Sequence, residues 1–287
     1  MSLKIIPGHR HYPLLERWIA PLAKRLLPRR PVLWRFARKR VGWPARLRMV
    51  HLSDLHCAAW TTESFVCSVV ERSLAERPDL ILWTGDFFHS SLGEMRRIMP
   101  LFRELHQAVP TYGVLGNHDY DDDVDAIRAI LEDCGIRLLC GEVVSLDIGG
   151  LRVRLGGIED YYTMGRPVPA ELFPREGCDF RILLSHQPSY VRQLPPNAVD
   201  LMLAGHLHGG QVRFPLVGPI YLPQMRGFEF LGKELCVVEG NPVHTSQGLG
   251  YTLLPLRFRC PPAISVIEIV PAAETVEAVR ECAAEVV

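Results

Sequence analysis

The chain has 287 residues, of which 48% are hydrophobic and 22% are charged, and its 23 glycines and 23 prolines follow no period. This composition excludes a disordered, collagenous or coiled-coil protein, and the length allows a large buried core. The 32 basic and 32 acidic residues cancel, yet residues 1–50 contain 13 Lys or Arg and one acid, Glu16, a net charge of +12. We therefore predict a basic N-terminal arm over residues 1–46, followed by an acidic domain over residues 47–287.

The first predicted element is an amphipathic helix in the arm. Its apolar residues fall near helical spacing before Pro28: Leu14, Leu15, Trp18, Ile19 and Leu22. Trp18, Trp34 and Trp43 are interleaved with arginines, a pattern that suits the interface of an anionic membrane. Two alternatives stay open, an arm packed on the acidic body and, less favoured, an arm that binds nucleic acid.

Short apolar runs alternate with amphipathic stretches after residue 46, which is typical of an α/β fold. The predicted strands are Leu47–Ser53, Leu80–Thr84, Thr111–Leu115, Leu151–Gly157, Phe180–Ser185, Leu201–Ala204 and Ala263–Val270. Glu63–Ala75 and Asp121–Cys134 have helical periodicity, and the second has an acidic first turn and ends before Gly135. The Pro- and Gly-rich stretch from Gly210 to Pro262 predicts long loops and short strands.

No segment predicts a membrane span or a signal peptide, because no uncharged apolar run reaches 18 residues and no apolar block precedes a cleavage site. None of the eight cysteines form a CxxC pair. Scattered thiols of this kind are typical of a cytosolic protein with reduced cysteines. We therefore expect a cytoplasmic location.

Polar side chains follow five of the predicted strands at their C-terminal ends. They are Asp54, His56, Asp86, Asn117, His186, His206 and His208. Ligand sites in α/β sheets form at this edge, and residues i and i+2 of an extended segment point the same way. Asp54 with His56, and His206 with His208, can each act as a pair. Glycines before Asp86, Asn117 and His206 let the backbone turn tightly or approach closely.

Seven donors are too many for one four-ligand zinc site. Two divalent ions about 3.5–4 Å apart that share a carboxylate use all seven. Asp86, the central donor in chain order, is the candidate bridge. The donors are oxygens and imidazoles without thiolates, so manganese fits best, with iron or zinc as alternatives.

The order of these motifs resembles the calcineurin-like metallophosphoesterases: D-x-H, G-D, G-N-H-D, H and G-H-x-H all occur, in that order, between Leu47 and Val270. Three further segments resemble a small bacterial branch related to UDP-2,3-diacylglucosamine pyrophosphohydrolases. They are Gly205–Pro215, Gly218–Gln224 and Gly248–Pro262.

The resemblance implies a four-layer αββα sandwich, with two mixed sheets flanked by helices, and a dinuclear metal-dependent hydrolase of phosphoester or pyrophosphate bonds. One ion would be held by Asp54, His56, Asp86 and His208. The other would be held by Asp86, Asn117, His186 and His206. His118 would protonate the leaving group. Arg213, near the site in the chain, is a candidate clamp for a substrate phosphate, with a surface salt bridge as an equal alternative.

One position departs from the family pattern. Many relatives have an acid three residues after the bridging aspartate, and this acid orients the histidine of the G-N-H motif. Here the position is His89. Either Asp119 or another acid orients His118, or His118 is a weaker general acid.

The arm and the branch resemblance together predict a peripheral enzyme on the inner face of the membrane. Its substrate would be a lipid-linked phosphoester or pyrophosphate such as UDP-2,3-diacylglucosamine. The alternatives are a phosphodiesterase for nucleic acid or cyclic nucleotides and, last, a non-enzymatic membrane adaptor. No obligate protein partner is inferred.

Overall fold

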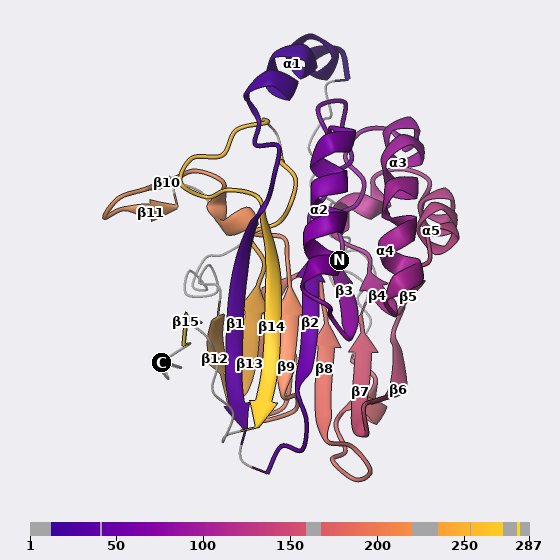
Figure 1. The fold of residues 1–287 in the computed structure, drawn as a ribbon, viewed down its shortest axis with the longest axis vertical. Coiled ribbons are helices and arrows are strands. Elements are labelled where there is room, and N and C mark those ends of the chain that lie inside the picture. Colours follow the sequence, from indigo (N-terminus) through magenta and orange to yellow (C-terminus); the bar gives the residue numbers. More distant parts are fainter. Residues whose placement is uncertain are drawn as a thin grey trace, which may run out of the picture.

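The computed structural model describes residues 13–40, 42–158, 168–219, 235–252, 254–271 and 280–281, without the side chains of residues 13–17 and 280–281. Two β-sheets lie face to face (Figure 1). The first sheet has the strand order β15-β1-β14-β2-β3-β4-β5. Its strands are β1 (Val32–Arg40), β2 (Leu47–Leu52), β3 (Leu80–Thr84), β4 (Thr111–Val114), β5 (Arg137–Leu138), β14 (Ala263–Pro271) and β15 (Arg280–Glu281). Strands β2 to β5 are parallel, and β14 is antiparallel to β2.

The second sheet has the order β12-β13-β9-β8-β7-β6. Its strands are β6 (Glu142–Ile148), β7 (Leu151–Gly157), β8 (Phe180–Leu184), β9 (Leu201–Ala204), β12 (Leu235–Val238) and β13 (Asn241–Thr245). The four inner strands are parallel, and the two edge strands are antiparallel to their neighbours. Both sheets are therefore mixed. A separate hairpin joins β10 (Arg213–Phe214) to β11 (Gly218–Pro219).

Side chains of the first sheet alternate between two cores, as the period of two in a strand requires. On β2, Val50 and Leu52 pack against the helices, whereas Leu47 and Met49 pack against the second sheet. The helical layer covers the outer face of the first sheet (Figure 1). It consists of α2 (Glu63–Ala75), α3 (Leu92–Ile98), the 3₁₀ helix η1 (Met99–Phe102), α4 (Arg103–Ala108) and α5 (Val124–Asp133).

The second sheet alternates in the same way. Ile182 and Leu184 of β8 face the first sheet, and Leu183 packs outward on two short 3₁₀ helices, η3 (Ala170–Leu172) and η4 (Pro188–Gln193). The order of layers is thus helices, sheet, sheet, helices, and the predicted αββα sandwich is confirmed.

The predicted strands and helices agree with the observed elements to within a few residues. Helix α2 has the predicted bounds, whereas α5 begins at Val124 and not at Asp121. The reason is local: the Asp123 side chain accepts the N–H of Ala126, so Asp123 is the N-cap.

The basic arm contributes to the sheet. Strand β1 lies within residues 1–46 and pairs with β14 over nine residues. Trp43 is 6% exposed, and its ring packs against Phe180 at 5.5 Å between centroids. The arginines of this region bind acids of the body: Arg35 Nη2 lies 2.5 Å from Glu76 Oε1, and Arg40 Nη1 lies 3.7 Å from Asp200 Oδ1. Of the two elements that the structure describes in the arm, helix α1 (Pro13–Leu26) lies outside the sheets, at one end of the molecule (Figure 1).

Within the described ranges, every helix is too short or too polar to cross a lipid bilayer. The seven cysteines that the structure describes are free thiols, and Cys282 lies outside the described residues.

Candidate metal centre

The predicted metal ligands gather where strands of both sheets end. Strands β2, β3 and β4 are neighbours in the first sheet, and β8 and β9 are neighbours in the second. Their carboxyl ends meet at the end of the molecule that carries α1 (Figure 1). Residues that are up to 154 positions apart in the sequence therefore enclose one site.

Two groups of donors occupy this site. One ligand atom from each member lies within 4.8 Å of every other member of its group. The first group is Asp54, His56, Asp86 and His208, and the second is Asp86, His186 and His206. Asp86 belongs to both, and its Oδ2 lies 3.1 Å from His186 Nε2 and 3.5 Å from His56 Nε2. This is a metal site of binuclear type, with Asp86 at the shared position.

Buried lone pairs show that these residues fit divalent cations. The Nε2 atoms of His56 and His208 face each other at 3.0 Å. Oδ2 of Asp54 is buried and makes no hydrogen bond within the described part of the chain. A buried carboxylate oxygen without a partner is costly unless it binds a cation. Oxygen and imidazole donors without thiolates suit manganese, iron or zinc.

The protonation states favour metal binding. Burial lowers the pKa of His56 and of His208 well below the ordinary value, so both rings are neutral at pH 7 and keep a free lone pair. Burial acts to raise the pKa of Asp86, but the His186 and His118 rings outweigh it and hold that pKa well below its usual range. His186 Nδ1 donates to the carbonyl of Thr84 at 2.6 Å, which leaves Nε2 as the acceptor that faces Asp86.

The ligand loops are strained. Five of the seven candidates have left-handed backbones, with φ of 53° at Asp54, 44° at His56, 56° at Asp86, 72° at His206 and 49° at His208. Such angles are uncommon for non-glycine residues and cluster at functional sites. The expectation that the two i, i+2 pairs lie on extended segments is therefore wrong. The pairs still converge, because Leu55 and Leu207 turn into the cores on either side.

Two glycines allow the loops to approach closely. A Cβ at Gly116 would collide with the carboxylate of Asp86, and a Cβ at Gly205 would collide with Ser53 and Asp54. The sequence predicts two reasons for the glycines before Asn117 and His206, a tight turn or a close approach. The structure shows close approach at both, and neither glycine has a left-handed backbone.

Asn117 and His118 begin the 3₁₀ helix η2 (Asn117–Tyr120). The Asn117 Oδ1 atom is buried and has no hydrogen-bond partner among the described residues, which suits a further oxygen ligand. The His118 amide donates to Asp86 Oδ1 at 2.9 Å, and the His118 ring lies 5.2 Å from the His56 ring. The structure thus brings His118 to the edge of the donor cluster.

Asp121 orients His118. Its Oδ2 lies 2.7 Å from His118 Nδ1, and the i, i+3 spacing in the 3₁₀ turn brings the two side chains together. Burial acts to lower the pKa of His118, but Asp86 and Asp121 outweigh it, and the pKa is raised. Of the possibilities left by the sequence, an acid other than Asp119 is therefore the partner that the structure shows for His118.

Asp119 has a different task. Its Oδ1 accepts the N–H groups of Phe87 and Phe88, and its Oδ2 accepts those of Asp86 and Gly116, all at 2.8–2.9 Å. This fully buried carboxylate ties the loop after β3 to the loop after β4. Burial and the neighbouring Asp86 raise the pKa of Asp119 to about 7, against the effect of these donors, so at pH 8 it accepts as a carboxylate.

His89, which replaces the family's acid, is buried. Its ring packs edge-on against His56 at 5.5 Å and against Trp60 at 5.2 Å between centroids. His89 therefore packs against the candidate ligand His56, while Asp121 orients His118.

Arg213 lies on β10, in the hairpin that follows the last ligand loop, and its amide donates to the carbonyl of Phe258 at 3.0 Å. Its role in binding substrate stays a prediction.

Sequence reasoning did not identify Arg257 as a residue of the site. Its guanidinium binds the carbonyl of Gly250 at 2.7 Å and lies 3.3 Å from His208 Nδ1 and from the His208 carbonyl. It thereby fixes the loop that carries His208. The signal was present in the segment Gly248–Pro262, where Arg257 lies among apolar residues.

The fold and the donor set define an αββα sandwich with a binuclear metal site. The sequence model of the family "Calcineurin-like phosphoesterase" matches residues 47–210, more than half of the chain. The chain belongs to this family, which confirms the resemblance in the sequence.

Its relatives include an uncharacterized metallophosphoesterase of Helicobacter pylori, 30% identical over 231 residues, which covers 78% of this chain and 60% of that protein. This chain thus spans less than two thirds of that relative. Another is the phosphodiesterase YaeI of Escherichia coli, 28% identical over 237 residues, with 79% of this chain and 83% of that protein covered. Among solved structures, the NAD nucleotidase of Haemophilus influenzae has a TM-score of 0.50 at 15% identity and covers 71% of this chain and 45% of that one. That likeness supports the fold alone.

Proposed function

We propose that this protein is a dinuclear metal-dependent phosphoester hydrolase that acts at a membrane surface on a lipid-linked phosphoester or pyrophosphate. The observation that carries the hydrolase proposal is the position of Asp86, which belongs to both donor groups. A carboxylate shared by two ions is the arrangement that phosphoryl transfer uses. The family and the name of the Escherichia coli relative, a phosphodiesterase, agree with it.

When two divalent ions are bound, they supply a nucleophilic water of lowered pKa and neutralise charge on the phosphate oxygens. The residues of the chain would bind and position these ions. The ligands would be Asp54, Asp86 and the four imidazoles, and Asp119 and Arg257 fix the loops that carry them. His118, whose raised pKa favours the protonated ring, holds a proton for the leaving oxygen.

Helix α1 supports action at a membrane. Its inner face, with Ala20 and Ala23, packs against Trp60 and Tyr251 of the body. Its outer stripe, with Trp18, Leu22 and Leu26 at i, i+4 and i+8, is 83%, 60% and 73% exposed. Lys24 and Arg25 lie in the last turn of α1, next to Leu26. An exposed apolar stripe flanked by cations suits an anionic lipid surface.

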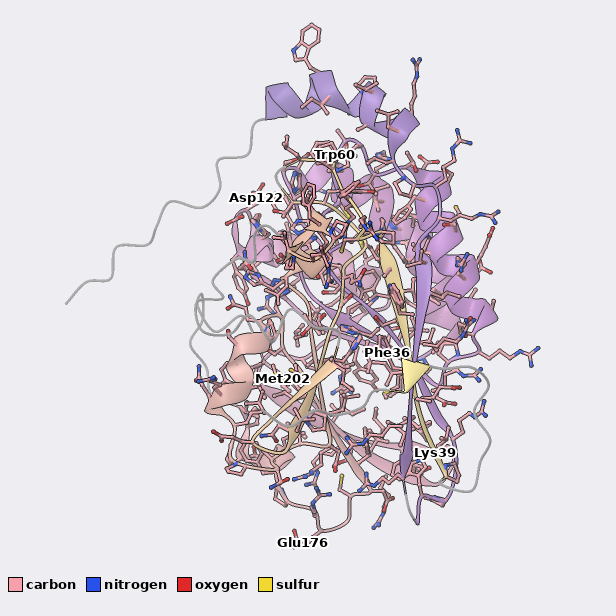
Figure 2. All side chains as sticks on the ribbon, turned by 90° about the vertical axis from the view of Figure 1, so that its left-hand side faces the viewer. Phe36, Lys39, Trp60, Asp122, Glu176 and Met202 are labelled. Carbon is pink, nitrogen blue, oxygen red and sulfur yellow. The ribbon has the colours of Figure 1, made fainter. Side chains whose placement is uncertain are left out.

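A second exposed apolar patch lies at the same end of the molecule (Figure 1). It combines the β10–β11 hairpin with a loop before β14, which meet where the rings of Phe214 and Phe258 lie 5.4 Å apart. Its members are Phe214, Leu216, Val217, Leu254, Leu256 and Phe258. Figure 2 places Trp60 directly beneath α1 at this end, and Lys39 and Glu176 at the other. Two apolar surfaces beside the metal centre suit a substrate that stays in the bilayer.

The membrane proposal rests on less of the arm than the sequence suggested. Trp34 and Trp43 pack on the core between the sheets, and Arg35 and Arg40 of β1 form ion pairs with the body, so of the three tryptophans Trp18 is the exposed one. The two ion pairs also neutralise part of the positive charge that would attract nucleic acid. UDP-2,3-diacylglucosamine, from the branch resemblance, is the specific lipid that we propose.

The hydrolase proposal is tested with bis(p-nitrophenyl) phosphate and added manganese. We expect turnover that EDTA abolishes and that Asp86→Asn lowers by at least a thousandfold, while the exposed control Asp122→Asn keeps the wild-type rate. Equal rates in Asp86→Asn and Asp122→Asn would contradict the proposal.

The lipid proposal is tested with vesicles of phosphatidylglycerol that contain UDP-2,3-diacylglucosamine. We expect cleavage of the lipid and co-sedimentation with vesicles, and we expect the pair Trp18→Ser and Leu22→Ser to reduce both at least fivefold. Glu132→Ser, on the exposed side of α5, is the control. A chain that cleaves bis(p-nitrophenyl) phosphate but neither binds vesicles nor cleaves the lipid would contradict the lipid proposal alone.

A further inference from the structure

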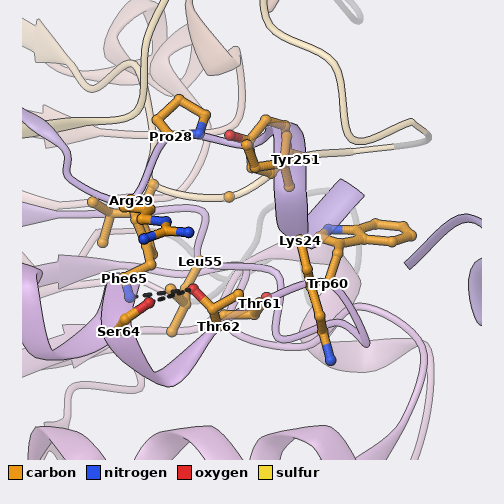
Figure 3. Close-up of a pocket in the computed structure, with 13 residues that line it drawn as sticks. Lys24, Pro28, Arg29, Leu55, Trp60, Thr61, Thr62, Ser64, Phe65 and Tyr251 are labelled. Carbon is orange, nitrogen blue, oxygen red and sulfur yellow. Dashed lines mark hydrogen bonds between the residues drawn. The ribbon is translucent and has the colours of Figure 1, made fainter. Parts of the chain in front are cut away.

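A cavity of about 320 Å³ lies between helix α1 and the body, outside the metal centre (Figure 3). Its lining comes from the end of α1 and the turn after it, from the start of α2, and from the loop Leu249–Tyr251. Pro28 and Tyr251 lie along one side, and Thr61, Thr62 and Ser64 lie along the other (Figure 3). The volume is at the lower end of the range for small-molecule sites.

Part of the cavity wall is apolar. Leu27, Leu55, Phe65 and Leu249 contribute aliphatic or aromatic carbon. Leu55 also separates the metal ligands Asp54 and His56 in the chain, so the cavity and the metal centre share a loop. The apolar walls suit a hydrocarbon chain.

The charged side chains that line the cavity are all basic. Lys24 and Arg29 bring two positive charges, and no acid is among its lining residues. Two acids are chain neighbours of lining residues: Asp54 belongs to the donor cluster, and Oε1 of Glu63 lies 3.8 Å from Arg97 Nη1. Helix α2 begins at the cavity, and the N-terminus of a 13-residue helix adds positive partial charge. The field in the cavity thus favours an anion.

Two residues that line this cavity, Trp60 and Tyr251, each carry a buried hydrogen-bond donor without an acceptor in the described part of the chain. Trp60 is 3% exposed and Tyr251 is 6% exposed. Neither the Trp60 Nε1 nor the Tyr251 Oη atom has a hydrogen-bond partner among the described residues. Burial raises the pKa of Tyr251 to about 12, so the hydroxyl keeps its proton at neutral pH. Buried donors without acceptors are rare and costly, and an acceptor-rich ligand would satisfy both.

We infer that this cavity binds a single-chain amphiphile with an anionic head, such as an alkyl phosphate. The head accepts hydrogen bonds from the Trp60 N–H and the Tyr251 hydroxyl and pairs with the charges of Lys24 and Arg29. The hydrocarbon chain lies along four apolar side chains, those of Leu27, Leu55, Phe65 and Leu249. The site goes beyond the proposed hydrolysis, because it lies outside the metal centre and needs no turnover.

The inference is tested by calorimetric titration of octyl phosphate into the full chain that carries Asp86→Asn. This substitution disables the metal centre, so the titration measures binding without hydrolysis. If the variant does not fold, the same titration is made with wild-type protein in the presence of EDTA. We expect one molecule bound per chain. We expect Lys24→Gln to weaken binding at least fivefold. We expect Tyr251→Phe, which removes the hydroxyl and keeps the ring, to weaken binding at least threefold. Arg25→Gln is the matched control, since it removes a neighbouring charge of α1 that does not line the cavity.

Inorganic phosphate has the anionic head without the chain, and octyl glucoside has the chain with an uncharged head. Each should bind at least tenfold more weakly than octyl phosphate. Three results would overturn the inference: no binding of octyl phosphate, equal binding of either probe, or equal effects of Lys24→Gln and Arg25→Gln.

Discussion

Substitution of Asp119 by Asn tests how the ligand loops are held. The side chain is fully buried, and each carboxylate oxygen accepts two backbone N–H groups. An amide keeps one oxygen, so in either orientation its NH₂ group faces two backbone N–H donors that lose their acceptor. Each buried unsatisfied donor costs about 1–3 kcal/mol. The expected loss is therefore about 2–6 kcal/mol, out of a typical total stability of about 5–15 kcal/mol.

The assay is urea unfolding at pH 8, followed by tryptophan fluorescence. Asp122→Asn is the matched control, because it is the same chemical change at an exposed residue three positions along the chain, and it should alter stability by less than about 0.5 kcal/mol. An Asp119→Asn variant as stable as this control would refute the idea that Asp119 fixes the ligand loops.

Two further substitutions test the roles of His118 and Gly116. Asp121→Asn removes a carboxylate that raises the pKa of His118, so the protonated ring should be lost at a lower pH. The alkaline limb of the pH–rate profile should then move to lower pH, and an unmoved limb would argue against His118 as the acid. Gly116→Ala places a Cβ against the Asp86 carboxylate, and it should weaken manganese binding in calorimetry at least tenfold. Gly93→Ala, where a Cβ meets only the Ser91 hydroxyl, should leave the affinity unchanged.

Much of the fold could be predicted because local patterns and tertiary structure agree. Strands β3, β7 and β9 and helix α2 have their predicted bounds, since each is a short apolar run or an amphipathic face between turn residues. Strand β1 was missed because its positive charges dominate the segment. Two of those charges, on Arg35 and Arg40, pair with acids of distant segments that no local pattern identifies.

The ligands of the candidate site could be predicted from residue types after strands, but their geometry could not. Left-handed angles at residues such as Asp54 and His206 depend on tertiary contacts that enforce them. The choice between Asp119 and Asp121 as the partner of His118 depends on the turn η2, which no periodicity reveals. Arg257 and the cavity under α1 depend on contacts between distant segments.

Metal stoichiometry tests the central claim most directly. The full chain, loaded with manganese and freed of excess metal, should hold two ions per molecule and give the electron paramagnetic resonance spectrum of two coupled Mn²⁺ ions. Asp86→Asn should lose the coupling, because the shared carboxylate is gone. A wild-type chain that binds a single ion, or two ions without coupling, would contradict a dinuclear centre bridged by Asp86.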